Sequence, residues 1–153
     1  MRPKLNAVGW AGLMVCLLAF AGEGQAQAAV LKLEAQLVWG TDDSKPPAGK
    51  NYQPVQPELK KKLKDLPLKW SNYFEVNRKS LEVKAGETRK EPMSDKCEIL
   101  VKHLDNSDLE VSLIGKGKEV MKRRQSLPRG EILVLGGNAP NATAWLVILR
   151  QAE

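Results

Sequence analysis

His103 and Cys97 are the residues of this chain whose types most often carry nucleophilic or metal chemistry. They lie six residues apart in one strand-like run, which separates them by roughly 20 Å at about 3.3 Å per residue. They therefore cannot bind one zinc ion together or form a thiolate–imidazole pair. His103 is the only histidine, so a serine nucleophile has no other imidazole as its base. We interpret His103 as a partly solvated residue near a turn and Cys97 as a buried structural residue.

Paired carboxylates are a second candidate for catalysis, since two of them can hydrolyse a glycosidic bond. Asp42–Asp43 and Asp105/Asp108 fit by composition, but both pairs lie in stretches rich in turn-forming residues. Aspartate is common in turns because its side chain bonds the neighbouring backbone. The spacing of an EF-hand calcium loop is absent. The sequence therefore predicts no catalytic residue, no metal site and no cofactor.

The stretch Gly115-Lys116-Gly117-Lys118 combines glycines with lysines, as phosphate-binding loops do. A P-loop needs four residues between its glycines and a helix after the loop, whereas here one residue separates the glycines and strand-like sequence follows. We therefore predict a hairpin turn or a bulge at this point.

Basic residues are concentrated between 115 and 129, where Glu119 is the only acidic residue. The candidate binding residues in this stretch are Lys116, Lys118, Lys122, Arg123, Arg124 and Arg129. Together with the lysines of the predicted helix they would suit an anionic envelope polymer, an anionic lipid or an acidic protein. The other interpretation is a solvated edge hairpin whose charges prevent strand-to-strand aggregation. Nucleic-acid binding is not expected, because the net charge of +6 is modest and aromatic residues are few.

The elements that position these residues are predicted to be mostly strands. Alternating apolar residues predict a strand over 30–39. Prolines, Gly, Asn and Asp predict a loop over 41–56, and leucines at 59, 63 and 66 after Pro57 predict an amphipathic helix over 57–66. Further strands are expected at 74–77, 81–84, 96–104, 109–114, 119–127, 131–135 and 144–149. The last of these is apolar throughout, as a central strand would be.

This spacing of short strands predicts a mainly β domain, a small antiparallel β-sandwich with one short amphipathic helix. It is immunoglobulin-like by analogy only, because the Cys–Trp–Cys pattern of antibody domains is absent. A barrel is the alternative topology. We expect Trp39 and Trp145 in the core and Trp70 as the residue that pins the helix to the sheet.

Residues 1–28 have the pattern of a cleaved secretory signal peptide. Arg2 and Lys4 precede a 15-residue apolar run at 7–21, and Ala26 and Ala28 supply the small residues before the cleavage point. The run is short for a bilayer-spanning helix, which needs about 20 residues. Residues 29–153 are therefore expected to be one extracytoplasmic domain, periplasmic or secreted, with no transmembrane segment in the mature chain.

These patterns predict an exported, non-enzymatic domain that binds a partner or supports an envelope structure. The expected partner is a protein or an anionic envelope polymer, contacted through the basic hairpin or through a strand added at a sheet edge. The alternative is a small extracytoplasmic hydrolase or enzyme inhibitor whose site is not visible in the sequence. The sequence does not define the ligand or the oligomeric state.

Overall fold

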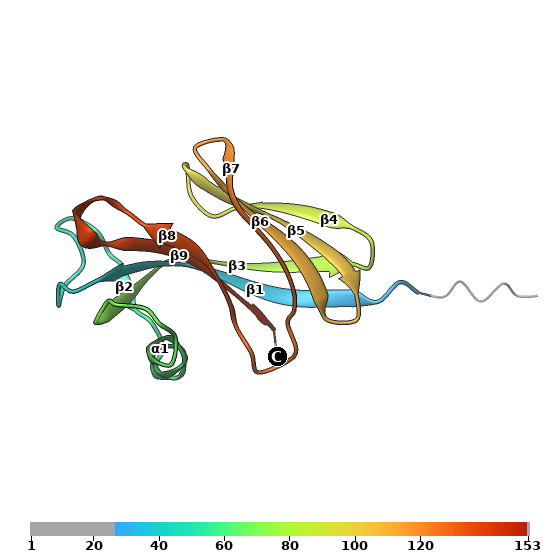
Figure 1. Ribbon diagram of the computed structural model, residues 1–153, viewed down its shortest axis with the longest axis horizontal. Coiled ribbons are helices and arrows are strands. Elements are labelled where there is room, and N and C mark those ends of the chain that lie inside the picture. The colour runs from blue at the N-terminus through green and yellow to red at the C-terminus, as the bar shows by residue number, and fades with distance from the viewer. Residues whose placement is uncertain (1–26, 153) are drawn as a thin grey trace, which may run out of the picture.

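The computed structural model describes residues 27–152, which form two antiparallel sheets packed face to face (Figure 1). The five-stranded sheet has the order β2-β3-β1-β9-β8 and the four-stranded sheet the order β4-β5-β6-β7. The strands of the first sheet are β1 (Val30–Thr41), β2 (Gln53–Pro54), β3 (Asn72–Lys84), β8 (Leu133–Asn138) and β9 (Ala144–Gln151). Those of the second are β4 (Thr88–Pro92), β5 (Cys97–Asp105), β6 (Asp108–Gly115) and β7 (Lys118–Ser126). The signal pattern lies outside the described residues, except for its last two positions.

The architecture is the predicted small antiparallel β-sandwich with one short helix, and the sheets do not close into a barrel. The likeness to an immunoglobulin domain is one of architecture and not of strand order. The second sheet consists of four consecutive strands, whereas immunoglobulin sheets are joined by Greek-key connections.

The main core lies between the two sheets. Leu31, Leu33, Ala35 and Leu37 alternate along β1 and point inward, as the sequence period predicted. They face buried residues of the second sheet, which are Ile99, Val101, Leu109, Val111 and Leu113. The alternation fixes the register, because a slip of one residue would turn every apolar side chain of β1 away from the core.

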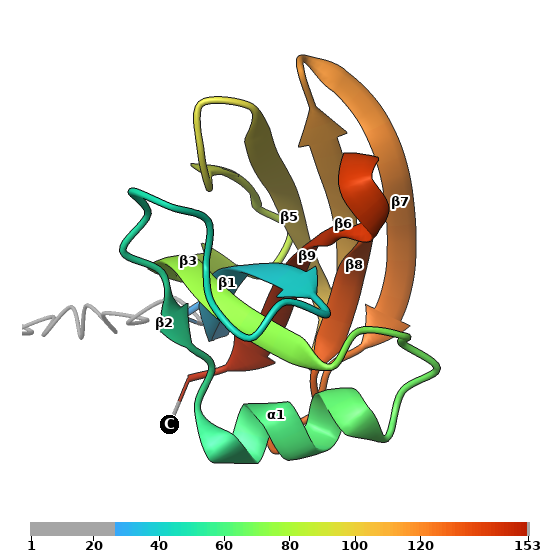
Figure 2. The ribbon, with the colours of Figure 1, turned by 90° about the vertical axis from the view of Figure 1, so that its left-hand side faces the viewer.

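A second apolar cluster lies on the outer face of the five-stranded sheet, where α1 (Pro57–Lys64) docks (Figure 2). Leu59 and Leu63 of the helix pack with Val38, Leu146 and Ile148 of the sheet. β9 is therefore buried on both faces over most of its length, as predicted. A helix of eight residues is unstable alone, so this contact is what keeps it folded.

The helix ends earlier than the predicted residue 66. The N–H groups of Asp65 and Leu66 bond carbonyls three residues back, which is 3-10 geometry and closes the last turn. Leu66 also precedes Pro67, and a residue before proline is disfavoured in helical geometry. Trp70 then packs against the helix cluster and donates its indole N–H to the carbonyl oxygen of Ala142 at 2.7 Å. It pins this region to the sheet, as expected.

Three strand predictions need correction. The expected strands 74–77 and 81–84 form one strand, β3, interrupted only by a bulge at Val76 opposite Leu37 and Val38. β4 was not predicted, because its residues Thr88–Pro92 are polar on both faces of an exposed edge. β2 has only two residues, Gln53–Pro54, and lay within the predicted loop.

Candidate functional site

A cleft between the sheets is the candidate functional site, and it follows from the unequal lengths of the strands. β1 has 12 residues and β3 has 13, whereas β5 and β7 have nine and β6 has eight. The shorter sheet covers the inner face of the longer one as far as Leu37. Beyond it, Trp39 and Trp145 lie outside the main core cluster, although Trp39 is only 7% exposed and is therefore buried as predicted. The loop before β2 covers part of this surface, with Tyr52 edge-on to Trp39 at a ring-centroid distance of 6.5 Å.

The remaining space, which we call the inter-sheet cleft, has a volume of about 930 Å³. Leu37, Val76 and Trp145 line it on the five-stranded sheet, and Cys97, Leu113 and Met121 line it on the other. Its size and apolar walls match those of ligand pockets, which commonly enclose about 300–1,000 Å³. A second hollow, of about 580 Å³ between residues 43–47 and 141–143, is bordered mainly by polar loop residues.

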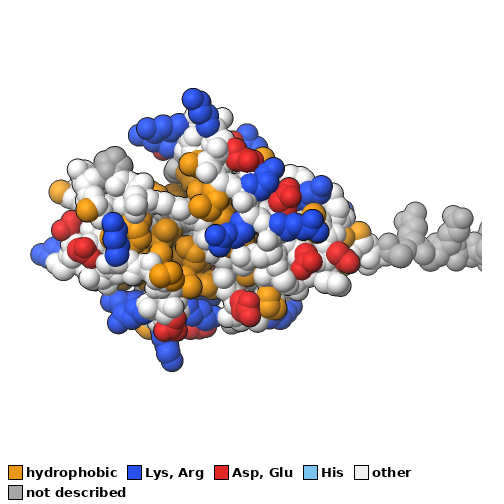
Figure 3. Space-filling view, in the orientation of Figure 1, with side chains coloured by type: hydrophobic (Ala, Val, Ile, Leu, Met, Phe, Trp, Pro, Cys, Tyr) orange, Lys and Arg blue, Asp and Glu red, His pale blue; other side chains and the backbone are white. Residues whose placement is uncertain are grey.

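Charged side chains border the inter-sheet cleft. Lys50, Lys96 and Lys116 stand at its mouth with a single acid, Asp95. None of these lysines forms an ion pair with any residue that the structure describes. Figure 3 shows hydrophobic side chains in the middle of one face, with lysine and arginine side chains around the β6–β7 end beside them. The mouth is therefore suited to a negatively charged group.

Backbone hydrogen bonds hold two of these lysines in place. In the loop between β4 and β5, the N–H groups of Met93 and Ser94 both donate to the carbonyl oxygen of Cys97. The side-chain amide of Asn77 in β3 donates to the carbonyl of Met93 at 2.8 Å and ties the loop to the other sheet. The N–H of Lys116 donates to the carbonyl of Lys96 at 2.9 Å, so the β6–β7 turn and this loop form one edge of the cleft.

Cys97 is half-buried in the wall of the inter-sheet cleft and makes no disulfide. Burial raises the pKa of its thiol, and the neighbouring Glu98 carboxylate raises it further. The thiol is therefore protonated at neutral pH, which makes it a poor nucleophile. The structural role expected from the sequence fits its packing against the core, but its side chain is less buried than predicted.

Trp145 is more exposed than the core position that the sequence predicted. It pairs with Trp39 across β1 and β9 and faces inward, yet 40% of its surface is exposed because no strand of the second sheet lies above it. Val120, also at the cleft, is 66% exposed at the bulge of β7. No sequence signal separates Trp145 from core residues, since it stands in a strand that is apolar over most of its length.

The six basic residues predicted to bind a partner do not form one patch. Lys116 lies in the β6–β7 turn at the cleft mouth and Lys118 begins β7, whereas Lys122, Arg123 and Arg124 follow along the same exposed edge strand. Arg129 lies beyond the other end of β7, and that end is itself about 26 Å along the strand from Lys118. There the next residue, Gly130, accepts a hydrogen bond from Lys62 of α1 at 2.6 Å. The turn at Lys116-Gly117, where both residues have positive φ, is the predicted hairpin turn.

Two of the groups considered for catalysis, His103 and Asp42, are engaged in structural contacts. His103 is 1% exposed, contrary to the partly solvated position predicted, because its ring enters the space between the sheets. Its Nδ1 lies 3.0 Å from the carbonyl oxygen of Val83 in β3, and its Nε2 lies 2.9 Å from that of Asn106. Asp42 accepts two hydrogen bonds from Ser71, through its backbone N–H and its hydroxyl. These contacts connect loops and sheets.

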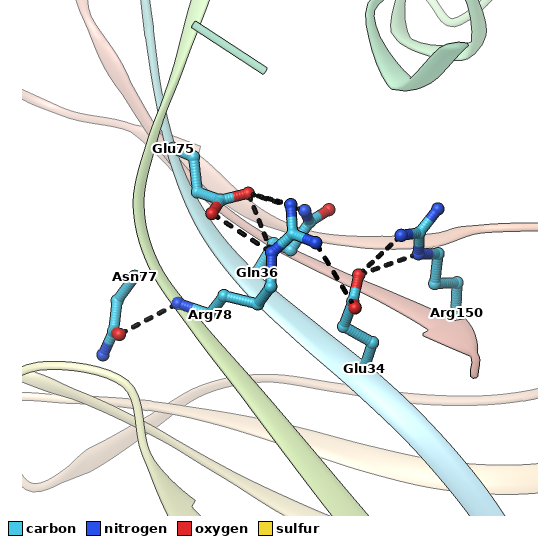
Figure 4. A network of polar contacts seen from close by, with 6 residues as sticks. All are labelled: Glu34, Gln36, Glu75, Asn77, Arg78 and Arg150. Carbon is cyan, nitrogen blue, oxygen red and sulfur yellow. Dashed lines mark hydrogen bonds and ion pairs between the residues drawn. The ribbon is translucent and has the colours of Figure 1, made fainter. Parts of the chain in front are cut away.

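A charged network lies on the outer face of the five-stranded sheet (Figure 4). Glu34 of β1 pairs with Arg150 of β9 at 2.7 Å and with Arg78 of β3 at 3.4 Å. Arg78 also binds Glu75 at 2.7 Å, and this contact, first among several, raises the pKa of the guanidinium. Gln36 donates to Glu75 at 2.7 Å, while its own buried carbonyl oxygen has no partner. The network ties three strands together.

Comparisons with known protein families, with curated proteins and with solved structures found no match. The fold and the cleft define the class of the domain, which is a β-sandwich with one open end. Within the described residues no helix is long and apolar enough to cross a membrane. No group of three or more metal-ligating side chains occurs among them.

Proposed function

We propose that this chain is a non-enzymatic binding domain that holds an apolar ligand with a negatively charged group in the inter-sheet cleft. The observation that carries this proposal is the cleft of about 930 Å³, apolar inside, with Lys50, Lys96 and Lys116 at its mouth. Burial of an apolar surface would supply the affinity, and the lysines would select the charge and orient the ligand.

The contacts of the polar groups support binding over catalysis. Both ring nitrogens of His103 face backbone carbonyls, and Asp42 is occupied by Ser71. Cys97 stands in the cleft wall, and its raised pKa keeps its thiol protonated. We therefore propose that the cleft positions a ligand and does not transform it.

The proposed setting is outside the cytoplasm, which the signal pattern of residues 1–28 supports. In an envelope, anionic polymers and proteins are available as partners. The basic edge of β7 is adjacent to the cleft through Lys116 and would add long-range attraction for such a partner.

Anilinonaphthalene sulfonate, an apolar dye with one sulfonate, has the chemistry that the cleft should accept. We expect the purified protein to bind it with a blue shift and a rise in fluorescence. Gly137→Phe should weaken binding about tenfold, because the site of its Cβ meets no atom within 4 Å and the new ring would enter the cleft.

The matched control is Ser80→Phe, which places the same ring at an exposed position on the outer face of β3. Thermal unfolding of each variant establishes that the fold is retained. Equal dye binding by Gly137→Phe and the unmodified protein would show that the cleft is not the site.

A further inference from the structure

The described sheets end at the edge strands β2, β4, β7 and β8, and β3 has a further free edge over 76–84 because β2 pairs with only two of its residues. All of these edges except β8 carry protection against pairing with another chain, and the free part of β3 is protected by Arg78, Lys79 and Glu82. β7 carries lysines and arginines and a bulge at Val120. β4 contains Arg89, Lys90 and Glu91 and ends at a proline, and β2 has only two residues. Charges, bulges, proline and short length are the usual means by which a sheet edge is blocked.

Arg123 shows how strongly β7 is protected. It pairs with Val111, so it lies on the face of β7 that points toward the core, yet it is exposed. An inward-pointing charge on an edge strand opposes the approach of a further strand, because the charge would be buried by it.

β8 lacks these protections. Its sequence, Leu-Val-Leu-Gly-Gly-Asn, has no charge and no proline, and its pairing with β9 has no register shift. Among the described residues it pairs only with β9, so the backbone groups of its other edge have no strand partner. Its last three residues, Gly136, Gly137 and Asn138, border the inter-sheet cleft.

Building on the proposed function, we propose that the ligand is an extended segment of a partner protein that pairs with the free edge of β8. Alternate side chains of such a segment point to one face, so its apolar residues would enter the cleft while backbone bonds form along β8. The open space at Gly137 allows another backbone to approach closely.

The charges around the site specify the partner segment further. Lys96 and Lys116 at the mouth, and Lys118 at the start of β7, lie on the cleft side of such a strand. They therefore call for Asp or Glu on the same face as its apolar residues, at the end of the segment. The same charges oppose pairing of β8 with β8 of a second copy, because the basic β7 strands of the two copies would then approach each other. We therefore assign the position to an acidic partner segment and not to this chain itself.

The test uses the synthetic peptide Glu-Thr-Val-Thr-Val-Thr-Glu, labelled for fluorescence anisotropy, in which both glutamates share a face with the valines. We expect it to bind the protein, and we expect backbone N-methylation of alternate residues to weaken binding by about tenfold, because the ladder bonds are lost. A peptide with lysine in place of glutamate should not bind. Lys96→Glu with Lys116→Glu should abolish binding of the acidic peptide, whereas the control pair Lys61→Glu with Lys64→Glu on α1 should not.

Amide exchange followed by NMR locates the contact. Residues of β8 should gain protection on addition of the peptide, and those of β4 and β7 should not. Equal binding of the N-methylated peptide, or protection at another edge, would overturn strand addition. Dimerisation abolished by Gly137→Phe would assign the position to a second copy instead. If the dye enters the cleft but no peptide binds, this inference is wrong and the proposed function stands; if neither binds, both are wrong.

Discussion

The backbone N–H of Lys116 donates a hydrogen bond to the carbonyl oxygen of Lys96 at 2.9 Å. Two lysines that are 20 residues apart in the sequence thus stand side by side at the mouth of the inter-sheet cleft. Neither forms an ion pair with a described residue, so both ammonium groups are available to a bound anion.

Removing both charges should separate stability from binding. Lys96→Gln with Lys116→Asn should leave the free energy of unfolding within about 0.5 kcal/mol, since asparagine tolerates the positive φ at position 116. Binding of anilinonaphthalene sulfonate should weaken several-fold, and its salt dependence should decrease. The measurement is a dye titration at low and high salt; an unchanged salt dependence would exclude these lysines as the anion contact.

Substitution by alanine should destabilise the protein much more at one of the two neighbouring glycines of β8 than at the other. A Cβ at Gly136 would overlap the carbonyl oxygen of Trp145 and lie 2.9 Å from the Cα of Leu146, whereas at Gly137 it would meet nothing within 4 Å. Gly136→Ala should therefore cost about 3 kcal/mol, while Gly137→Ala should cost under about 1 kcal/mol. Urea unfolding of the two variants gives the comparison, and similar midpoints would contradict it.

His103 should contribute to the stability of the fold. Its ring bridges Val83 in one sheet and Asn106 beside the other, so His103→Ala would remove contacts of two carbonyl oxygens and leave a cavity. We expect a loss of about 2–4 kcal/mol in the free energy of unfolding. Chemical denaturation measures this loss. Ser94→Ala, in an exposed loop, serves as a comparison whose free energy of unfolding should change little. A similar loss of stability in both variants would contradict the bridging role of His103.

Glu34 neutralises two arginines at once, so its removal should cost more than a single exposed ion pair does. Glu34→Gln would leave Arg78 and Arg150 facing each other without their shared carboxylate, at an expected cost of about 1–2 kcal/mol. Adding Arg150→Met should recover part of that loss. A double-mutant cycle measures the coupling, and additive effects would mean that the network contributes little.

Stability should fall at alkaline pH. Burial raises the pKa of Cys97 above its ordinary 9.0 and that of Tyr73 above 10.0. Because the unfolded chain loses these protons first, the contribution of each group is intact below its ordinary pKa and is lost as pH rises through the folded value. Urea unfolding should therefore show lower stability at pH above about 9 than at neutral pH. Cys97→Ser should reduce that difference, and an unchanged difference would exclude the thiol.

The sandwich could be predicted where apolar periodicity reports burial. β1, the β5–β6 hairpin and β9 each carry that pattern, and the structure places them where it indicates. β4 and the middle of β3 could not be found this way, because their residues are mainly polar and face solvent or the charged network. Local pattern reports which face is buried and does not report which strands lie opposite each other.

The candidate site illustrates the same limit. The basic stretch was visible in the sequence, and one of its members, Lys116, reaches the cleft. The cleft itself results from a difference in length between strands of separate sheets. The sequence therefore predicts Trp145 to be a core residue, and only the structure shows that no strand of the second sheet covers it. Burial of His103 depends likewise on contacts with β3, 20 residues away in sequence.

The sheets are joined at one end and apart at the other. At the joined end, His103 spans the gap to β3 and Leu127 is fully buried where the chain passes from one sheet to the other. The domain is therefore a wedge that is closed at the His103 end and open at the inter-sheet cleft. Because the separation of two sheets that are held together at one end grows with distance from that end, substitutions near His103 should alter the width of the cleft without touching any residue that lines it.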